Sequence, residues 1–150
     1  MLSINLQRTQ MNTSTLFQAA NSFAMIGWLF LLIVPNWKYT KTVITTGIIV
    51  LLAVFYAFLV LKDISSFNPD SFSTLENVMK LFQNEQAVLA GWVHYLAFDL
   101  FVGTYIAENA KLLNISRWIV SPILFFTFMF GPVGFLLFFI VKTVKSNISN

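Results

Sequence analysis

Two ionisable side chains, His94 and Asp99, lie deep inside an apolar stretch of the sequence that is bounded by Glu85 and Glu108. Imidazole and carboxyl groups are the residue types that donate and accept protons in general acid–base catalysis. A carboxylate deep in a membrane helix costs about 2.5–3.5 kcal/mol on insertion scales, so such residues usually face the interior of a helix bundle and often mark a functional path. We therefore take His94 and Asp99 as candidate acid and base for an apolar substrate.

Helical spacing separates these two groups. At ~100° per residue, His94 is rotated ~140° from Asp99, so they meet only across a substrate, through a helix distortion or through residues of other helices. One stripe of the helix carries Trp92, Tyr95, Asp99, Gly103 and Ile106, and the other carries His94, Phe98, Phe101 and Tyr105. Two alternatives stay open: Asp99 is a hydrogen-bonded strut between helices with His94 as a packing residue, or Asp99 is a proton relay in a transport path.

The composition indicates that the surrounding solvent is lipid. Of 150 residues 57% are hydrophobic and 10% charged, and the mean hydropathy is +0.76. Soluble chains carry about 25% charged residues, so the sequence excludes a soluble enzyme, a disordered tail and a nucleic-acid-binding module. The net charge of +3 comes from dispersed cations at the edges of apolar runs, which is typical of head-group anchors. The lack of cysteine and the single histidine argue against a zinc or haem site.

The apolar runs predict an all-α polytopic membrane protein, a bundle of four transmembrane helices forming one integral membrane domain over residues 1–150. A span needs about 20 residues. We expect a polar tail over the first fourteen residues and then spans at about 15–34, 42–61, 87–107 and 118–141. Four spans would put both chain ends on one side of the membrane. The basic residues would then divide five against four, which leaves the orientation open.

A short amphipathic helix is expected before the third span, at about 73–83. Ser73 and Glu76 form a capping-box pattern. Apolar residues follow at helical spacing on one face, namely Leu75, Val78, Met79 and Phe82. Such a helix should lie along the membrane surface or over the mouth of the bundle.

Aromatic residues near the candidate acid and base suggest a groove for a long apolar or polyene ligand. The run FGPVG contains Pro132, which should kink or open the fourth span. Lipid-facing packing is the plainer interpretation of the many phenylalanines. The substrate-binding candidates are Trp92, Tyr95, Phe98, Asn21, Phe128 and Pro132.

Two blocks carry a family resemblance. The stretch STLENVMKLFQNEQAVLAGWVHYLAFDLFVG, residues 73–103, is followed by FMFGPVGFLLFFIVK, residues 128–142. Together they resemble the abscisic-acid-deficient-four family, small four-span membrane proteins required in plants for making neoxanthin from violaxanthin, with many bacterial relatives. Spans one and two match only in length and hydropathy. The family commonly has Arg where this chain has Thr104.

The resemblance implies carotenoid metabolism and a long isoprenoid or carotenoid ligand. The family's plant reaction turns an epoxide end group into an allenic alcohol, which needs an acid at the epoxide oxygen and a base at a neighbouring C–H. His94 and Asp99 stand at the motif positions for this cofactor-free isomerisation, and Glu108 at the span edge is a candidate to assist. The short N-terminal tail without a transit peptide suggests a bacterial inner membrane.

Two other functions stay open: a non-catalytic scaffold that presents carotenoid to a pathway partner, and a small carrier. Membrane lipid is the expected surrounding partner, and a homo-oligomer is possible through small-residue contacts such as Gly91 and Gly103.

Overall fold

The structure is a computed structural model that describes residues 2–35, 37–62, 64 and 68–149, with side chains from 12 to 147. Every regular element in this part of the chain is a helix, which confirms the expected all-α class. Three helical stretches are long and apolar enough to cross a membrane, at Asn12–Ile33, Thr40–Lys62 and Glu85–Leu112.

The first helix, α1, runs over Leu2–Ile33. Residues 2–14, expected as a polar tail before the first span, continue this helix toward the N-terminus, and the part apolar enough to span begins at Asn12. No proline precedes Pro35 and no glycine precedes Gly27, so nothing in the polar segment interrupts the helical backbone. Pro35 then follows the end of α1, where a residue that cannot continue a helix is typical.

The second candidate span is one helix in three parts. It consists of α2 (Thr40–Thr42), the π-helical η1 (Val43–Ile49) and α3 (Val50–Lys62). Thr40 is buried at its start, and its Oγ1 donates a 2.5 Å hydrogen bond to the Val34 carbonyl. This bond ties the end of α1 to the start of the returning helix.

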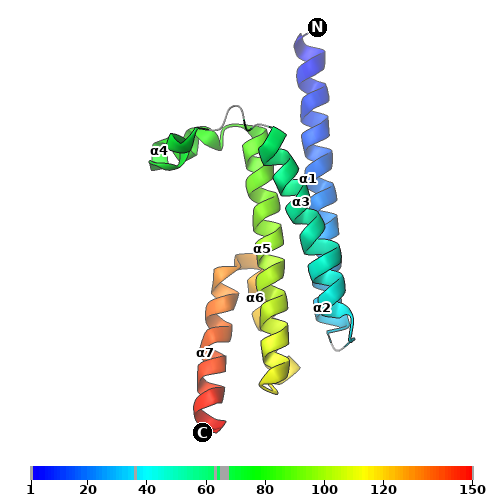
Figure 1. Ribbon diagram of the computed structural model, residues 1–150, viewed down its shortest axis with the longest axis vertical. Helices are drawn as coiled ribbons and strands as arrows, with labels where there is room; N and C mark the ends of the chain where they lie inside the picture. The colour runs from blue at the N-terminus through cyan, green and yellow to red at the C-terminus, as the bar shows by residue number, and fades with distance from the viewer. Residues whose placement is uncertain (1, 36, 63, 65–67, 150) are drawn as a thin grey trace.

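A short helix, α4 (Leu75–Leu81), precedes α5 and projects sideways from the level where α5 begins (Figure 1). The 3-10 helix η3 (Pro69–Phe72) leads into it. The expected capping box is wrong in detail, because Thr74 rather than Ser73 accepts the bond from the Asn77 N–H, at 3.2 Å. Ser73 instead donates to the Asp70 carbonyl at 2.8 Å. Its expected position along the membrane surface stays a prediction.

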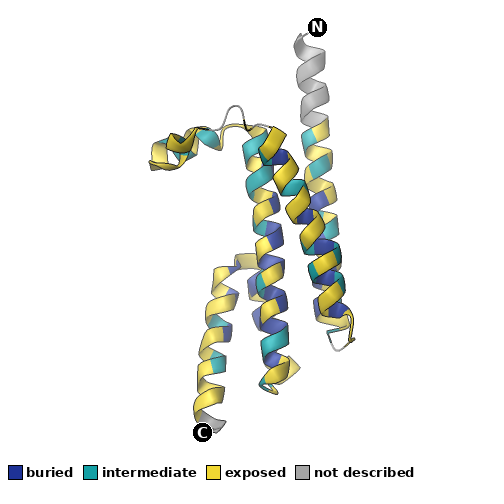
Figure 2. Cartoon of the chain, in the orientation of Figure 1, coloured by how far each residue is buried: buried dark blue, intermediate teal, exposed yellow. Residues whose placement is uncertain are grey.

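The 28-residue helix α5 (Glu85–Leu112) is the centre of the fold. Its start is capped by Asn84, whose Oδ1 accepts bonds from the N–H groups of Gln86 and Ala87. It contacts α1, α3, α6 and α7. Figure 2 shows the buried residues concentrated where these helices meet, and the outward faces exposed.

The segment expected as a fourth span is two helices. Helix α6 (Arg117–Phe130) ends at Gly131, whose φ is +40°, and α7 (Pro132–Ser149) begins directly after it. The two lie side by side as a hairpin whose turn reaches about half-way along α5 (Figure 1). The predicted interruption at Pro132 is at the right place, but it reverses the chain instead of kinking it. A four-span bundle is therefore not confirmed.

The hairpin changes which end of the molecule carries the cations. Both chain ends were expected on one side, and this is wrong: α1 begins at one end and α7 finishes at the other (Figure 1). Among the described side chains, two basic residues, Lys62 and Lys80, belong to the end near α4. Six belong to the opposite end, namely Lys38, Lys41, Lys111, Arg117, Lys142 and Lys145. We call this second end the basic end.

Candidate functional site

His94 lines a cavity of about 700 Å³ between α3, α4 and α5. Its imidazole contacts the ring of Tyr56 on α3, with ring centroids 5.4 Å apart. The cavity has an apolar wall on α3 and α5, including Leu59, Val60 and Ala90. Its other wall is polar and comes from η3, α4 and the start of α5, including Asn77, Lys80, Asn84 and Gln86. An amphipathic cavity of this kind suits a ligand with one polar end.

An exposed aromatic stripe continues from the cavity along α5. His94 stacks on Phe98 with 4.5 Å between ring centroids. Phe98 and Phe101 are 58% and 52% exposed, and Tyr105 packs its ring against Phe135 of α7 at 6.1 Å. The eleven helical steps from His94 to Tyr105 cover about 16 Å of helix. The stripe predicted from helical spacing is therefore present and faces outward.

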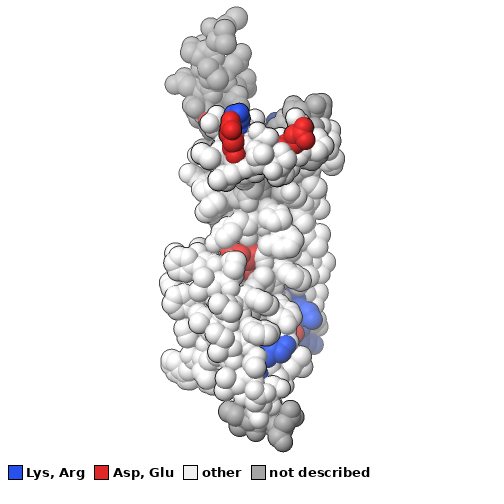
Figure 3. All heavy atoms as spheres, turned by 90° about the vertical axis from the view of Figure 1, so that its left-hand side faces the viewer, with Lys and Arg blue, Asp and Glu red and all other residues white. Residues whose placement is uncertain are grey.

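Asp99 lies on another side of α5, against the turn of the hairpin. It is 8% exposed, and a Cβ built on Gly131 would collide with its Oδ1. Its Oδ2 has no hydrogen-bond partner among the described residues. Tyr95, one turn earlier, interacts with the Asp99 carboxyl and donates to the carbonyls of Phe128 and Met129, at 3.3 and 3.4 Å. Figure 3 shows one acidic side chain within the wide uncharged band between the charged ends.

Of the remaining substrate-binding candidates, Trp92 on α5 and Phe128 on α6 each contact a residue of α1. Trp92 Nε1 donates to Asn21 Oδ1 at 3.1 Å, and its ring lies 5.4 Å from that of Phe17. Phe128 on α6 packs edge-on against Trp28 of α1 at 5.4 Å. Pro132 is exposed at the first position of α7, where its fixed φ suits a helix start.

Seven of the nine predicted site residues divide into two groups, while Pro132 starts α7 and Glu108 lies at the basic end. His94 and Phe98 lie on the cavity and its outward stripe. Asn21, Trp92, Tyr95, Phe128 and Asp99 form contacts between helices. The His94 ring and the Asp99 carboxyl do not line one cavity. This agrees with the ~140° rotation between them on an ideal helix. Their chemical roles stay predictions.

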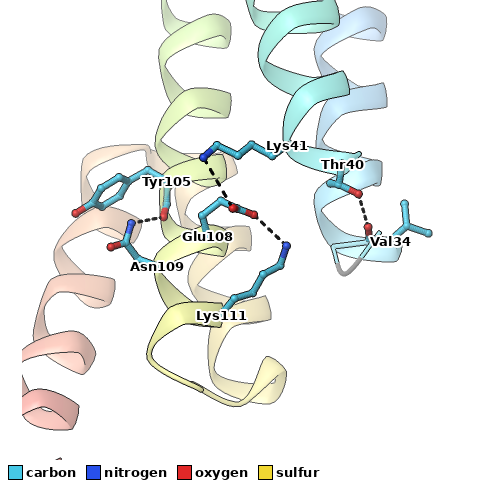
Figure 4. Close-up of polar contacts among 7 residues, drawn as sticks. All are labelled: Val34, Thr40, Lys41, Tyr105, Glu108, Asn109 and Lys111. Carbon is cyan, nitrogen blue, oxygen red and sulfur yellow. Dashed lines mark hydrogen bonds and ion pairs between the residues drawn. The ribbon is translucent and has the colours of Figure 1, made fainter. Parts of the chain in front are cut away.

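Glu108 lies at the basic end, where its carboxylate pairs with two lysines (Figure 4). The distances are 3.0 Å to Lys111 Nζ and 4.0 Å to Lys41 Nζ. Thr104, where the family commonly has Arg, is buried and donates to the Leu100 carbonyl of its own helix at 2.9 Å. The Glu108 carboxylate therefore has ion-pair partners, and the Thr104 hydroxyl has a hydrogen-bond partner within its own helix.

Sequence reasoning missed Tyr56 and the polar wall of the cavity. Tyr56 sits in an uninterrupted apolar run, and nothing in that run distinguishes it from a lipid-facing aromatic residue. The polar wall looked like a solvated loop. Its clustering near His94 depends on how α4 folds across α3 and α5, which no local pattern encodes. No group of three or more His, Cys, Asp or Glu side chains able to hold a metal occurs in the part of the chain that the structure describes.

These features define an all-helical membrane protein with an amphipathic cavity beside a single histidine. A family model described as ABA DEFICIENT 4-like matches residues 15–138, so the chain belongs to this family, as the motif resemblance indicated. No curated protein and no solved structure matches the chain significantly.

Proposed function

We propose that the protein binds a long isoprenoid of the carotenoid class and isomerises its end group, with His94 as the proton-transfer residue. The observation that carries this proposal is the continuity between the His94 cavity and the exposed aromatic stripe of α5. An end group would occupy the cavity, and the apolar chain would lie along Phe98 and Phe101 toward the α7 rings. Family membership supports the carotenoid class of ligand.

The charges around the cavity favour a neutral polar end group. Lys80 is already paired with Glu76 at 2.8 Å, and Asp70 adds an acid to the lining itself. Amide side chains such as Asn77 and Gln86 are suited to hydroxyl, epoxide or carbonyl oxygens. A cavity without an unpaired cation offers little to a phosphate.

The proposed isomerisation needs no cofactor because substrate and product contain the same atoms and electrons, and only a proton and a C–O bond move. A base removes a proton from a carbon next to the epoxide, the C–O bond opens, and the oxygen gains a proton. His94 is the base in this proposal. The Tyr56 phenol, on α3 and in ring contact with His94, is the second group that can donate a proton.

A carotenoid-producing bacterial host tests this assignment. We expect His94→Ala to lower product formation by about 10²-fold or more, which is the usual scale of a lost general base. Asp99→Asn keeps the shape of the side chain and should retain product formation, because Asp99 faces the hairpin rather than the cavity. An active His94→Ala together with an inactive Asp99→Asn would overturn the assignment.

Non-catalytic carotenoid binding, for presentation to a pathway partner, is the second candidate. The separation of His94 from Asp99 favours it, because the cavity then holds no carboxylate of α5 beside the histidine. It predicts that His94→Gln leaves host carotenoid conversion unchanged while the pigment still co-purifies.

For localisation, the proposal is a multi-pass protein of a bacterial cytoplasmic membrane. The α6–α7 hairpin is then a fourth membrane-embedded element that enters from the basic end. The six-against-two distribution of described cations supports a cytoplasmic basic end.

A further inference from the structure

A second cavity lies at the basic end, where α1, α5 and α6 meet. Its volume is about 280 Å³. Its floor is apolar and includes Leu31, Val120 and Leu124. Its lining contains two cations, Lys111 and Arg117, and no acid.

The cations of this cavity are held in place and keep donors to spare. Arg117 Nη2 donates to the Leu32 carbonyl at 2.9 Å, which fixes the guanidinium at the end of α1. An arginine carries five N–H donors, so most remain available. Lys111 Nζ is held by Glu108 at 3.0 Å, and Lys41 approaches the same carboxylate from α2 (Figure 4). One carboxylate thus orients two lysines, and the cluster keeps a positive excess.

The cavity lies near exposed aromatic residues that mark a membrane–water interface, and this position indicates a lipid ligand. Trp118, next to Arg117, is 90% exposed, and Trp37 and Tyr39 on the α1–α2 link are 46% and 48% exposed. Exposed Trp and Tyr at helix ends are typical of the membrane–water interface. The apolar lining of the cavity suits the acyl chain of a lipid, and its two cations suit the phosphate of the head group.

From these observations we propose that the cavity between α1, α5 and α6 binds the head group of an anionic phospholipid, with Arg117 and Lys111 contacting its phosphate. The site is distinct from the His94 cavity and does not depend on what that cavity binds. Anionic lipid would bridge the end of α1 to the start of the hairpin and so hold α6 in register with α5.

Native mass spectrometry of the detergent-solubilised full chain, titrated with phosphatidylglycerol or phosphatidylcholine, tests the proposal. We expect phosphatidylglycerol adducts at lower lipid concentration than phosphatidylcholine adducts. Lys111→Gln should weaken phosphatidylglycerol binding about fivefold, and the double variant with Arg117→Gln more strongly, since each interfacial cation contributes on the order of 1 kcal/mol. Arg117→Lys keeps the charge and should retain much of the affinity.

The matched control is Lys142→Gln with Lys145→Gln, which removes the same charge from α7 at the same end. It should leave adduct formation within about twofold of wild type. If the control loses as much phosphatidylglycerol binding as the double variant, the attraction is a diffuse surface effect and the proposed site is wrong. Equal binding of phosphatidylcholine would also overturn the site, and so would displacement of the lipid by millimolar inorganic phosphate, which would indicate a site for free phosphate. Because Arg117 also bonds to Leu32, the single Lys111→Gln variant keeps the test valid if the double variant fails to fold.

Discussion

The carboxyl group of Asp99 on α5 fills the space that a side chain of Gly131 would enter. Gly131 joins α6 to α7 with a φ of +40°, so the hairpin turn and the buried acid are fitted to each other. Asp99 therefore lies beside the start of α7, where the positive end of a helix dipole favours a carboxylate. This packing explains why a costly acid is kept in the middle of an apolar helix without assigning it to the His94 cavity.

Gly131→Ala should destabilise the protein. The new methyl group would collide with Asp99, and an L residue at positive φ is strained, which together cost about 1–3 kcal/mol. Thermal unfolding in detergent, followed by circular dichroism, measures the effect. Gly47→Ala is the control, because a Cβ there meets nothing within 4 Å, and it should stay within about 1 kcal/mol of wild type. Equal unfolding temperatures for the two variants would contradict the fitted turn.

Asn21→Ala should cost about 1 kcal/mol more than Asn109→Ala. Both amides donate to a carbonyl four residues earlier in their own helix, Asn21 to Phe17 and Asn109 to Tyr105. Only Asn21 also accepts from Trp92 on another helix. Comparing the free energies of unfolding of the two variants in detergent isolates that interhelical bond. Equal values would show that the bond does not stabilise the packing of α1 on α5.

Single cysteines test the hairpin, because the natural chain has none. We expect Lys142→Cys and Lys41→Cys to react with a membrane-impermeant maleimide from the same side, and Lys80→Cys from the other. By the distribution of cations, Lys142 and Lys41 should be cytoplasmic. A continuous fourth span would instead place Lys142 with Lys80, so that pattern would exclude the hairpin.

Labelling in intact cells and in inverted vesicles separates orientation from topology. If Lys41 and Lys142 share a side that proves to be periplasmic, the hairpin holds and the cytoplasmic assignment of the basic end is wrong.

The sequence was sufficient to predict the long helices. The spans around Trp28, Leu52 and Asp99 were predictable from length and hydropathy alone, and so were the two stripes of α5 that carry Asp99 and His94. The hairpin was not predictable, because a proline between two glycines breaks a helix without saying how far the chain turns. That angle depends on tertiary packing, which includes the close approach of Gly131 to Asp99. The start of α1 was missed because a polar composition was given more weight than the lack of helix breakers.

The candidate site was only partly predictable for a related reason. His94 stood out because it is the single histidine in the chain. The other residues of its cavity did not, since Tyr56 and Lys80 come to line that cavity only through the way α3 and α4 pack around α5. Glu108 stood out as an acid at a span edge, but its pairing with Lys41 depends on the return of the chain after α1.

Reshaping the His94 cavity, which Gly91 and Phe82 both line, should reduce ligand binding without unfolding the protein. A Cβ at Gly91 would lie 2.9 Å from the Phe82 ring of the α4 end, so Gly91→Val pushes Phe82 and α4 away from their places around the cavity. Phe82 is 47% exposed and free to shift, so the cost in stability should stay near 1 kcal/mol. Pigment retention and unfolding temperature, measured on the same preparation, separate the two effects.

The most direct test of the central claim is the absorption spectrum of the protein purified from a carotenoid-producing host. The account predicts that wild-type protein and Gly47→Ala retain carotenoid in near-stoichiometric amount, and that Gly91→Val loses most of it. Wild-type protein that carries only phospholipid, or Gly91→Val with as much pigment as wild type, would contradict carotenoid binding at the His94 cavity.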